Sequence, residues 1–133
     1  MEKYMYPAIY HDAENGGYWV SFPDFKGAFT QGRTLEETYD MCIDCLGLAL
    51  STWDEASEGP VPAPSDLKSI HAAEGEHVVL IQFDMDEYYR KLNKKPVKKT
   101  LTIPRWLNEL AVEKGINFSA TLTQALKEKL GIL

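Results

Sequence analysis

Apolar residues in the first part of the chain fall into short runs that predict β-strands. The runs are rich in aromatic and β-branched residues and are bounded by turn signals such as Asn15-Gly16 and Pro23-Asp24. The predicted strands span residues 4–10, 17–22, 28–31 and 78–83. Pro7 cannot donate to a β-ladder, so the first strand should have an edge or a bulge there. The last run is apolar throughout, which predicts a central strand buried on both faces.

A different spacing follows the third strand and predicts one long helix. Thr34-Leu35-Glu36-Glu37 has the pattern of a capping box, with Thr34 as the N-cap. Apolar residues then recur every three or four positions, which indicates one buried stripe. The stripe consists of Leu35, Tyr39, Cys42, Leu46, Ala49, Leu50 and Trp53. We expect this helix to end at Gly59-Pro60, and a second, short helix to begin at Asp84 and reach Leu92.

The carboxyl-terminal pattern begins with a strand-like alternation over residues 98–103. Lys98, Thr100 and Thr102 share one side, and Lys99, Leu101 and Ile103 share the other. Pro104 suits the first position of a helix, and Gly115 suits its left-handed exit. Asn117 or Ser119 is expected to cap the last helix.

This carboxyl-terminal segment is too short to bury a core alone, because chains of about forty residues usually need disulfides, metals or a partner. We expect the strand to pair with the same strand of a second copy. A two-stranded ribbon fits the major groove of DNA, where Lys98, Thr100 and Thr102 would face the bases. Free amides at the start of the last helix would suit a phosphate. The alternative is a plain helical hairpin that docks on the rest of the chain.

The charge is divided unevenly between the two parts of the chain. Residues 1–89 carry four basic and seventeen acidic residues, a net charge of −13, whereas residues 90–133 carry ten and three, a net charge of +7. This asymmetry indicates two functions and a boundary near Asn93, which divides the chain into domains 1–92 and 93–133. The acidic part either binds a basic protein or is a solvated surface. No apolar run suits a membrane helix or a signal peptide, so we expect a cytoplasmic protein without a membrane contact.

Two cysteines, Cys42 and Cys45, form a C-x-x-C pair inside the predicted helix. Redox pairs of this kind lie at a helix start, where the helix dipole lowers the pKa of the thiol. The position within the helix instead predicts inert, buried cysteines, and free thiols suit a reducing cytoplasm. The three histidines show no ligand spacing, and the sequence indicates neither a metal site nor a cofactor.

Residues 97–131 resemble the ribbon-helix-helix repressors in the order and spacing of the strand, Pro104, Gly115 and the capped last helix. The resemblance implies an antiparallel pair of strands in a homodimer, with outward side chains that read bases. The matching base-reading positions are Lys98, Thr100 and Thr102. The positions that match the family's phosphate clamp are Asn117, Phe118 and Ser119.

The amino-terminal part resembles HicB antitoxins. The resemblance rests on the segments Tyr18-Trp19-Val20-Ser21-Phe22-Pro23-Asp24-Phe25-Lys26-Gly27, Thr30-Gln31-Gly32 and Thr34-Leu35-Glu36-Glu37. It implies a partial RNase H-like domain, hence an α+β protein with a small, mostly antiparallel sheet and one long helix before the ribbon-helix-helix module. It also implies an antitoxin that masks a HicA-type, mRNA-cleaving toxin and represses its own operon by binding operator DNA.

For toxin contact we expect Trp19, Asp24 and Phe25, near the turn after the second strand. The alternative is that Trp19 and Phe25 belong to the core. Free sheet edges would allow two dimers to associate into a tetramer.

Two other functions stay open at this stage. The implied RNase H-like fold suggests a metal-dependent nuclease as one alternative. Such catalysis needs a carboxylate on the first strand, and the strand from Tyr4 to Tyr10 carries none. The acidic residues of the long helix are spaced as a solvated face, so the sequence does not indicate an enzyme. A transcription regulator that senses a small ligand is the other possibility, and no Gly-rich or convergent polar motif supports it.

Overall fold

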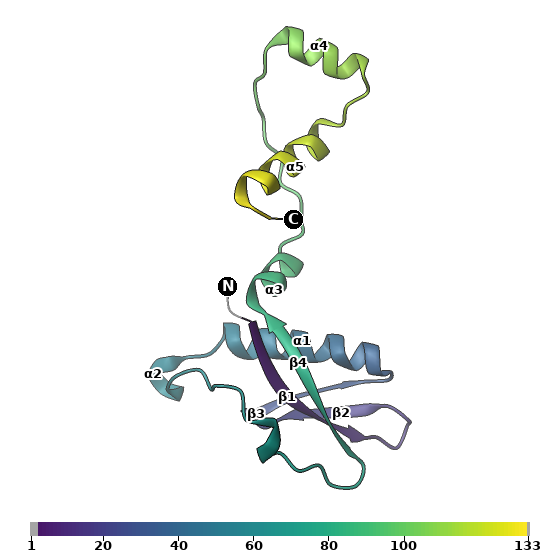
Figure 1. Cartoon of the computed structure of the whole chain (residues 1–133), viewed down its shortest axis with the longest axis vertical. Coiled ribbons are helices and arrows are strands. Elements are labelled where there is room, and N and C mark those ends of the chain that lie inside the picture. Colours follow the sequence, from purple (N-terminus) through teal and green to yellow (C-terminus); the bar gives the residue numbers. More distant parts are fainter. Residues whose placement is uncertain (1–2, 133) are drawn as a thin grey trace. The chain divides into compact units, whose positions relative to one another are not determined.

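The computed structural model describes residues 3–132 and divides into two compact units, Met1–Lys95 and Pro96–Leu133 (Figure 1). The first unit contains a sheet and most of the helices, and the second contains two helices. The elements are β1 (Lys3–Asp12), β2 (Tyr18–Phe22), β3 (Phe25–Gly32), α1 (Leu35–Ser51), α2 (Glu55–Glu58), the 3-10 turn η1 (Leu67–Ser69), β4 (Glu76–Asp84), α3 (Met85–Leu92), α4 (Arg105–Glu113) and α5 (Phe118–Leu130). The α+β class with a small antiparallel sheet is therefore confirmed.

The four strands form one antiparallel sheet in the order β3-β2-β1-β4. β4 pairs with β1 over its whole length, from Glu76 opposite His11 to Asp84 opposite Lys3. β4 is thus an edge strand, and the prediction of a central strand was wrong. β1 pairs with β2 only from Ile9 onward, so at Pro7 it has β4 on one side alone. This confirms the edge expected at the proline.

The core lies between one face of the sheet and α1. It consists of Tyr6, Ala8, Tyr10, Val20, Phe22, Phe25, Cys42, Leu46, Ile81 and Phe83. On β4 the buried residues alternate, since Ile81 and Phe83 are fully buried whereas Leu80 is exposed. The expectation that this strand is buried on both faces was therefore wrong. An edge strand covered by a helix on one side needs apolar residues at alternate positions only.

α1 begins as predicted and ends earlier than predicted. The Thr34 side chain accepts a hydrogen bond from the Glu37 amide at 3.1 Å. The helix ends at Ser51, and the Thr52 hydroxyl donates to the Leu48 carbonyl at 2.7 Å. The Asp54 side chain then accepts from the Ala56 amide and starts α2. Side-chain hydrogen bonds of this kind compete with the helical ladder, and they end α1 before Gly59.

The buried stripe of α1 differs from the predicted one at its beginning. Leu35 is exposed, although the spacing placed it on the buried side. Thr38 is fully buried instead, and its hydroxyl donates to the Thr34 carbonyl at 2.6 Å. The first turn of α1 thus places a polar residue against the sheet. Gly32 of β3 lies so close to Thr38 that a side chain at position 32 would overlap it.

The two helices of the second unit begin and end as the sequence predicts, whereas the predicted strand over residues 98–103 is not formed. Pro104 precedes α4, and Gly115 leaves it with a φ of 69°. The Ile116 amide donates a hydrogen bond to the Ala111 carbonyl at 3.0 Å, which completes the turn after α4. The Asn117 side chain caps α5. Residues 98–103 have no strand partner in the described chain, so the ribbon stays a prediction that needs a second copy.

Within residues 96–132 no side chain is buried. No helix of the described chain is both long and apolar enough to cross a lipid bilayer.

Close packing between α1 and α3 depends on Gly47, which is buried in the carboxyl-terminal part of α1. A Cβ built on Gly47 would overlap the ring of Tyr88. That ring packs on Phe83 of the core, with the two centroids 5.7 Å apart. A glycine inside a helix is unfavourable by itself, so the contact with Tyr88 is the physical reason for its presence here.

We expect Gly47→Ala to lower the free energy of unfolding by about 1–3 kcal/mol, because the methyl group overpacks the site. In a Tyr88→Ala background the same change should raise it by about 1 kcal/mol, since alanine is the better helix former. Urea unfolding of the four variants measures both effects. A loss of equal size in the two backgrounds would contradict the proposed contact.

Candidate binding surfaces

Trp19 stands on the face of the sheet opposite α1. Its neighbours Val20 and Phe22 point toward α1 and are buried, whereas Trp19 is 43% exposed. Its ring stacks on His11 of β1, with the centroids 3.6 Å apart and the planes inclined by 6°. Trp19 therefore presents one covered and one accessible ring face.

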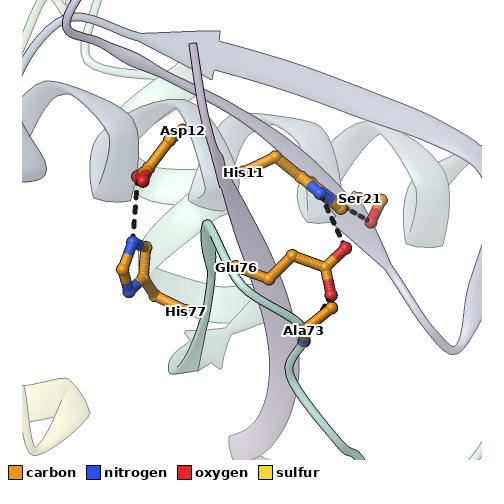
Figure 2. A network of polar contacts seen from close by, with 6 residues as sticks. All are labelled: His11, Asp12, Ser21, Ala73, Glu76 and His77. Atoms are coloured by element: carbon orange, nitrogen blue, oxygen red, sulfur yellow. Dashed lines mark hydrogen bonds and ion pairs between the residues drawn. The ribbon is translucent and has the colours of Figure 1, made fainter.

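A polar network holds the His11 ring in place (Figure 2). One ring nitrogen, Nε2, lies 2.9 Å from the Ser21 hydroxyl, and the other, Nδ1, lies 3.2 Å from the Glu76 carboxylate. The second oxygen of Glu76 accepts a hydrogen bond from the Ala73 amide at 2.9 Å. β2 and the start of β4 thus fix the orientation of a ring carried by β1, and the loop before β4 holds Glu76 in place.

A second pair lies beside this network in Figure 2, where the His77 ring meets Asp12 at 2.9 Å. His77 and Asp12 are both largely exposed. The pair joins β4 to the end of β1, next to the register between Glu76 and His11. The start of β4 is therefore attached to the end of β1 by two adjacent side-chain pairs.

The turn between β2 and β3 is occupied by structural contacts. Asp24 accepts hydrogen bonds from the amide and the hydroxyl of Ser65, which attaches the loop after α2 to the turn. Phe25 is only 3% exposed and makes edge contacts with Tyr6 and Trp53. These contacts favour the core alternative for Phe25. Of the three residues expected to contact a toxin, Trp19 offers a large accessible side chain.

Phe29, which lies on β3 beside Trp19, was not predicted as a contact residue from the sequence. Its ring centroid is 6.4 Å from that of Trp19, and its side chain is 64% exposed. The pairing of Phe29 with Ser21 puts it on the same sheet face as Trp19. Pairing the second and third predicted strands residue by residue could have identified this position. A register shift next to Phe22 makes that pairing ambiguous from the sequence.

The two cysteines are set inside α1 without the features of a redox pair. Cys42 is fully buried, and its Sγ lies 3.9 Å from the Tyr10 hydroxyl. Burial raises the pKa of the Cys42 thiol to about 11 and also raises the pKa of Cys45. A raised pKa keeps both groups as unreactive thiols at neutral pH. Within residues 3–132, no three His, Cys, Asp or Glu side chains come together as a metal site.

The residues expected to contact DNA are all exposed in the second unit. Lys98, Thr100 and Thr102 lie in the extended segment before α4. At the start of α5, Asn117 accepts a hydrogen bond from the Ala120 amide at 3.0 Å. The amides of Phe118 and Ser119 have no hydrogen-bond acceptor within the described chain. This is the usual state of the first amides of a helix, and they suit an anion.

Comparison with known proteins gives one consistent family. A model of the family described as HicB-like antitoxin of bacterial toxin–antitoxin systems matches residues 6–125. Antitoxin HicB 1 of Photorhabdus laumondii is 34% identical over 100 residues, which are 71% of this chain and 64% of that protein. Antitoxin HicB of Escherichia coli is 41% identical over 64 residues, which are 48% of this chain and 46% of that protein. The chain thus spans less than two thirds of the length of these relatives.

Two solved structures share the fold. One is described as a toxin–antitoxin complex from Streptococcus pneumoniae and is 31% identical, with a TM-score of 0.56 over 96% of this chain and 99% of that one. The other is the antitoxin HicB of Burkholderia pseudomallei, 21% identical, with a TM-score of 0.52 over 96% of this chain and 97% of that one. The second supports the fold alone.

The buried Cys42 thiol makes a prediction about alkaline pH. The pKa of this thiol rises from 9.0 to about 11 on folding, because burial disfavours the charged thiolate. The free energy of unfolding that depends on keeping the thiol neutral is therefore fully present below pH 9 and is lost as the pH rises through 11. We expect this one group to remove about 2 kcal/mol of unfolding free energy by pH 11. Urea unfolding between pH 8 and 11 should show a shallower decline for Cys42→Ala than for the wild type. Equal declines would contradict the assignment.

Proposed function

The chain belongs to the family of HicB-like antitoxins, and we propose that it masks a HicA-type toxin with its first unit and represses its own operon with its second. In this proposal the first unit is a binding module without catalytic function, and the protein acts in the cytoplasm. The functional division follows the domains 1–92 and 93–133. It differs by three residues from the division of the chain at Lys95.

Charge supports the assignment of the toxin to the first unit. Residues 1–89 have a net charge of −13, and the carboxylates of α1 form part of that surface, among them Glu36, Glu37, Asp40 and Asp44. A small toxin that binds mRNA is expected to be basic, and opposite charges accelerate and orient association. The relative from Streptococcus pneumoniae is described as part of a toxin–antitoxin complex, which supports a toxin partner here.

The observation that carries the second half of the proposal is the absence of buried side chains within residues 96–132. Large apolar residues of this unit are exposed, namely Leu101, Ile103, Trp106, Leu107, Leu110, Val112, Ile116, Phe118, Leu126 and Leu130. Two short helices with so much uncovered apolar surface are not stable alone. A second copy that pairs residues 98–103 and interlocks the helices gives a ribbon-helix-helix dimer.

Pairing of the two strands also explains the basic side chains of this unit. In an antiparallel ribbon, Leu101 and Ile103 turn toward the helices, and Lys98, Thr100 and Thr102 turn outward. Lysine and threonine side chains can bond to base edges in the major groove. The free amides of Phe118 and Ser119 would then bind backbone phosphates, which fix the position of the ribbon on the duplex.

Changing Lys98 and Thr100 together to alanine should weaken operator binding by about 100-fold or more. Each copy in the dimer would lose the base contacts of both side chains. Neutralisation of the toxin should be unchanged. A gel-shift titration across salt concentrations, together with a growth assay with the coexpressed toxin, measures the two activities.

The matched control changes Lys127 and Thr123 of α5 to alanine, which removes the same side-chain types outside the ribbon. Operator binding should stay near the wild-type level. If the Lys98 and Thr100 variant releases toxicity while it remains folded, the proposed division between the two units is wrong.

A further inference from the structure

Exposed apolar side chains surround the edge strand β3. Trp19 of β2 and Phe29 of β3 lie on the sheet face opposite α1, whereas Met41 and Leu48 lie on α1 itself. We call Trp19, Phe29, Met41 and Leu48 the β3–α1 strip. Phe29 and Leu48 are 64% and 62% exposed, and Met41 and Trp19 are also exposed. Met41 and Leu48 are seven residues apart on α1, so they face the same direction. Exposed apolar groups that are contiguous, rather than scattered, mark sites of protein interaction.

Two shallow hollows connect the members of the strip. One, of about 430 Å³, is lined by Trp19, Gln31, Glu37 and Met41, among others. The other, of about 330 Å³, is lined by Phe29, Cys45, Leu48 and Ala49, among others. Trp19 and Phe29 contact one another, so the two hollows share a common wall. An incoming protein can therefore place side chains in both hollows at once.

Trp19 is the rigid part of this surface. His11 covers one of its faces, and Ser21 and Glu76 hold the His11 ring on both nitrogens (Figure 2). A side chain that is ordered before binding loses little entropy on binding. Tryptophan residues held in this way are frequent among the few residues that dominate interface affinity.

The charge of the first unit decides which occupant suits the strip. With a net charge of −13 over residues 1–89, two copies of this unit would repel one another, whereas a basic protein would be attracted. The accessible face of Trp19 also suits an arginine or lysine side chain, because the ring face attracts cations. Glu37 and Arg33 both line the same hollow as Trp19 and pair with one another at 3.7 Å, so the attraction for a basic partner comes from the charge of the whole unit.

We infer that the β3–α1 strip is the surface on which the basic toxin docks, with Trp19 as its central anchor. The inference rests on the proposed function, since it names the contact surface of the same toxin. The inferred toxin contact therefore lies away from the β2–β3 turn. In that turn Asp24 is hydrogen-bonded to Ser65 and Phe25 is buried in the core.

The test measures the dissociation constant between the full-length chain and the HicA-type toxin of the same operon. Phe29→Ala with Leu48→Ala should weaken binding at least about tenfold, and so should Trp19→Ala. The matched control, Tyr89→Ala with Leu92→Ala, removes side chains of α3 that are 66% and 63% exposed. It should leave the dissociation constant within about twofold of the wild-type value. Operator binding and thermal unfolding of each variant report whether it is folded.

Hydrogen exchange on the wild-type chain keeps the test decisive if a strip variant does not fold. Toxin binding should slow exchange in residues 27–32 and 41–49. Slower exchange confined to residues 22–26 or to β4 would overturn the inference, and so would strip variants that bind like the wild type. In both cases toxin binding, and with it the proposed function, would stand. A wild-type chain that does not bind the toxin would instead overturn the proposed function itself.

Discussion

The second unit buries no side chain among residues 96–132, and the proposed functions of the tail follow from this constraint. α4 has nine residues and α5 has thirteen, and isolated helices of such lengths are marginal in water. Burying each large apolar side chain stabilises by about 1.5–3 kcal/mol, and that stabilisation is available to the tail on contact with another surface. Folding, dimerisation and presentation of the basic strand to DNA are thus a single event in this account.

The first unit is different because its sheet and α1 enclose a core from a single chain. What it leaves exposed is therefore informative. The His11 ring, fixed between Ser21 and Glu76, supports an exposed tryptophan, although an exposed ring contributes little to the stability of the unit itself. A surface residue that is ordered before its partner arrives loses little entropy on binding, and Trp19 has that property on an acidic unit.

Local rules predicted several helix ends, although α1 ends at Ser51 and not at Gly59. The Thr34 cap, the Gly115 exit and the Asn117 cap each depend on a few neighbouring residues, and the structure confirms all three. Tertiary arrangement was harder to predict. β4 lies at the edge because, among the described strands, it pairs with β1 alone. The residues of β4 do not by themselves determine which strand they pair with.

Phe25 and Phe29 illustrate the same limit within a candidate site. Four residues apart in one strand, they would normally share a face. A register shift pairs Phe25 with buried Phe22 and Phe29 with outward Ser21, so the first is core and the second is surface. Sedimentation equilibrium of the chain of residues 1–133 and of its Ile103→Glu variant tests the interlocked dimer of the second unit. We expect a wild-type dimer or larger assembly and a variant that dissociates toward the 15.1 kDa monomer. A wild-type chain that is monomeric with a folded tail would show that the tail needs no second copy.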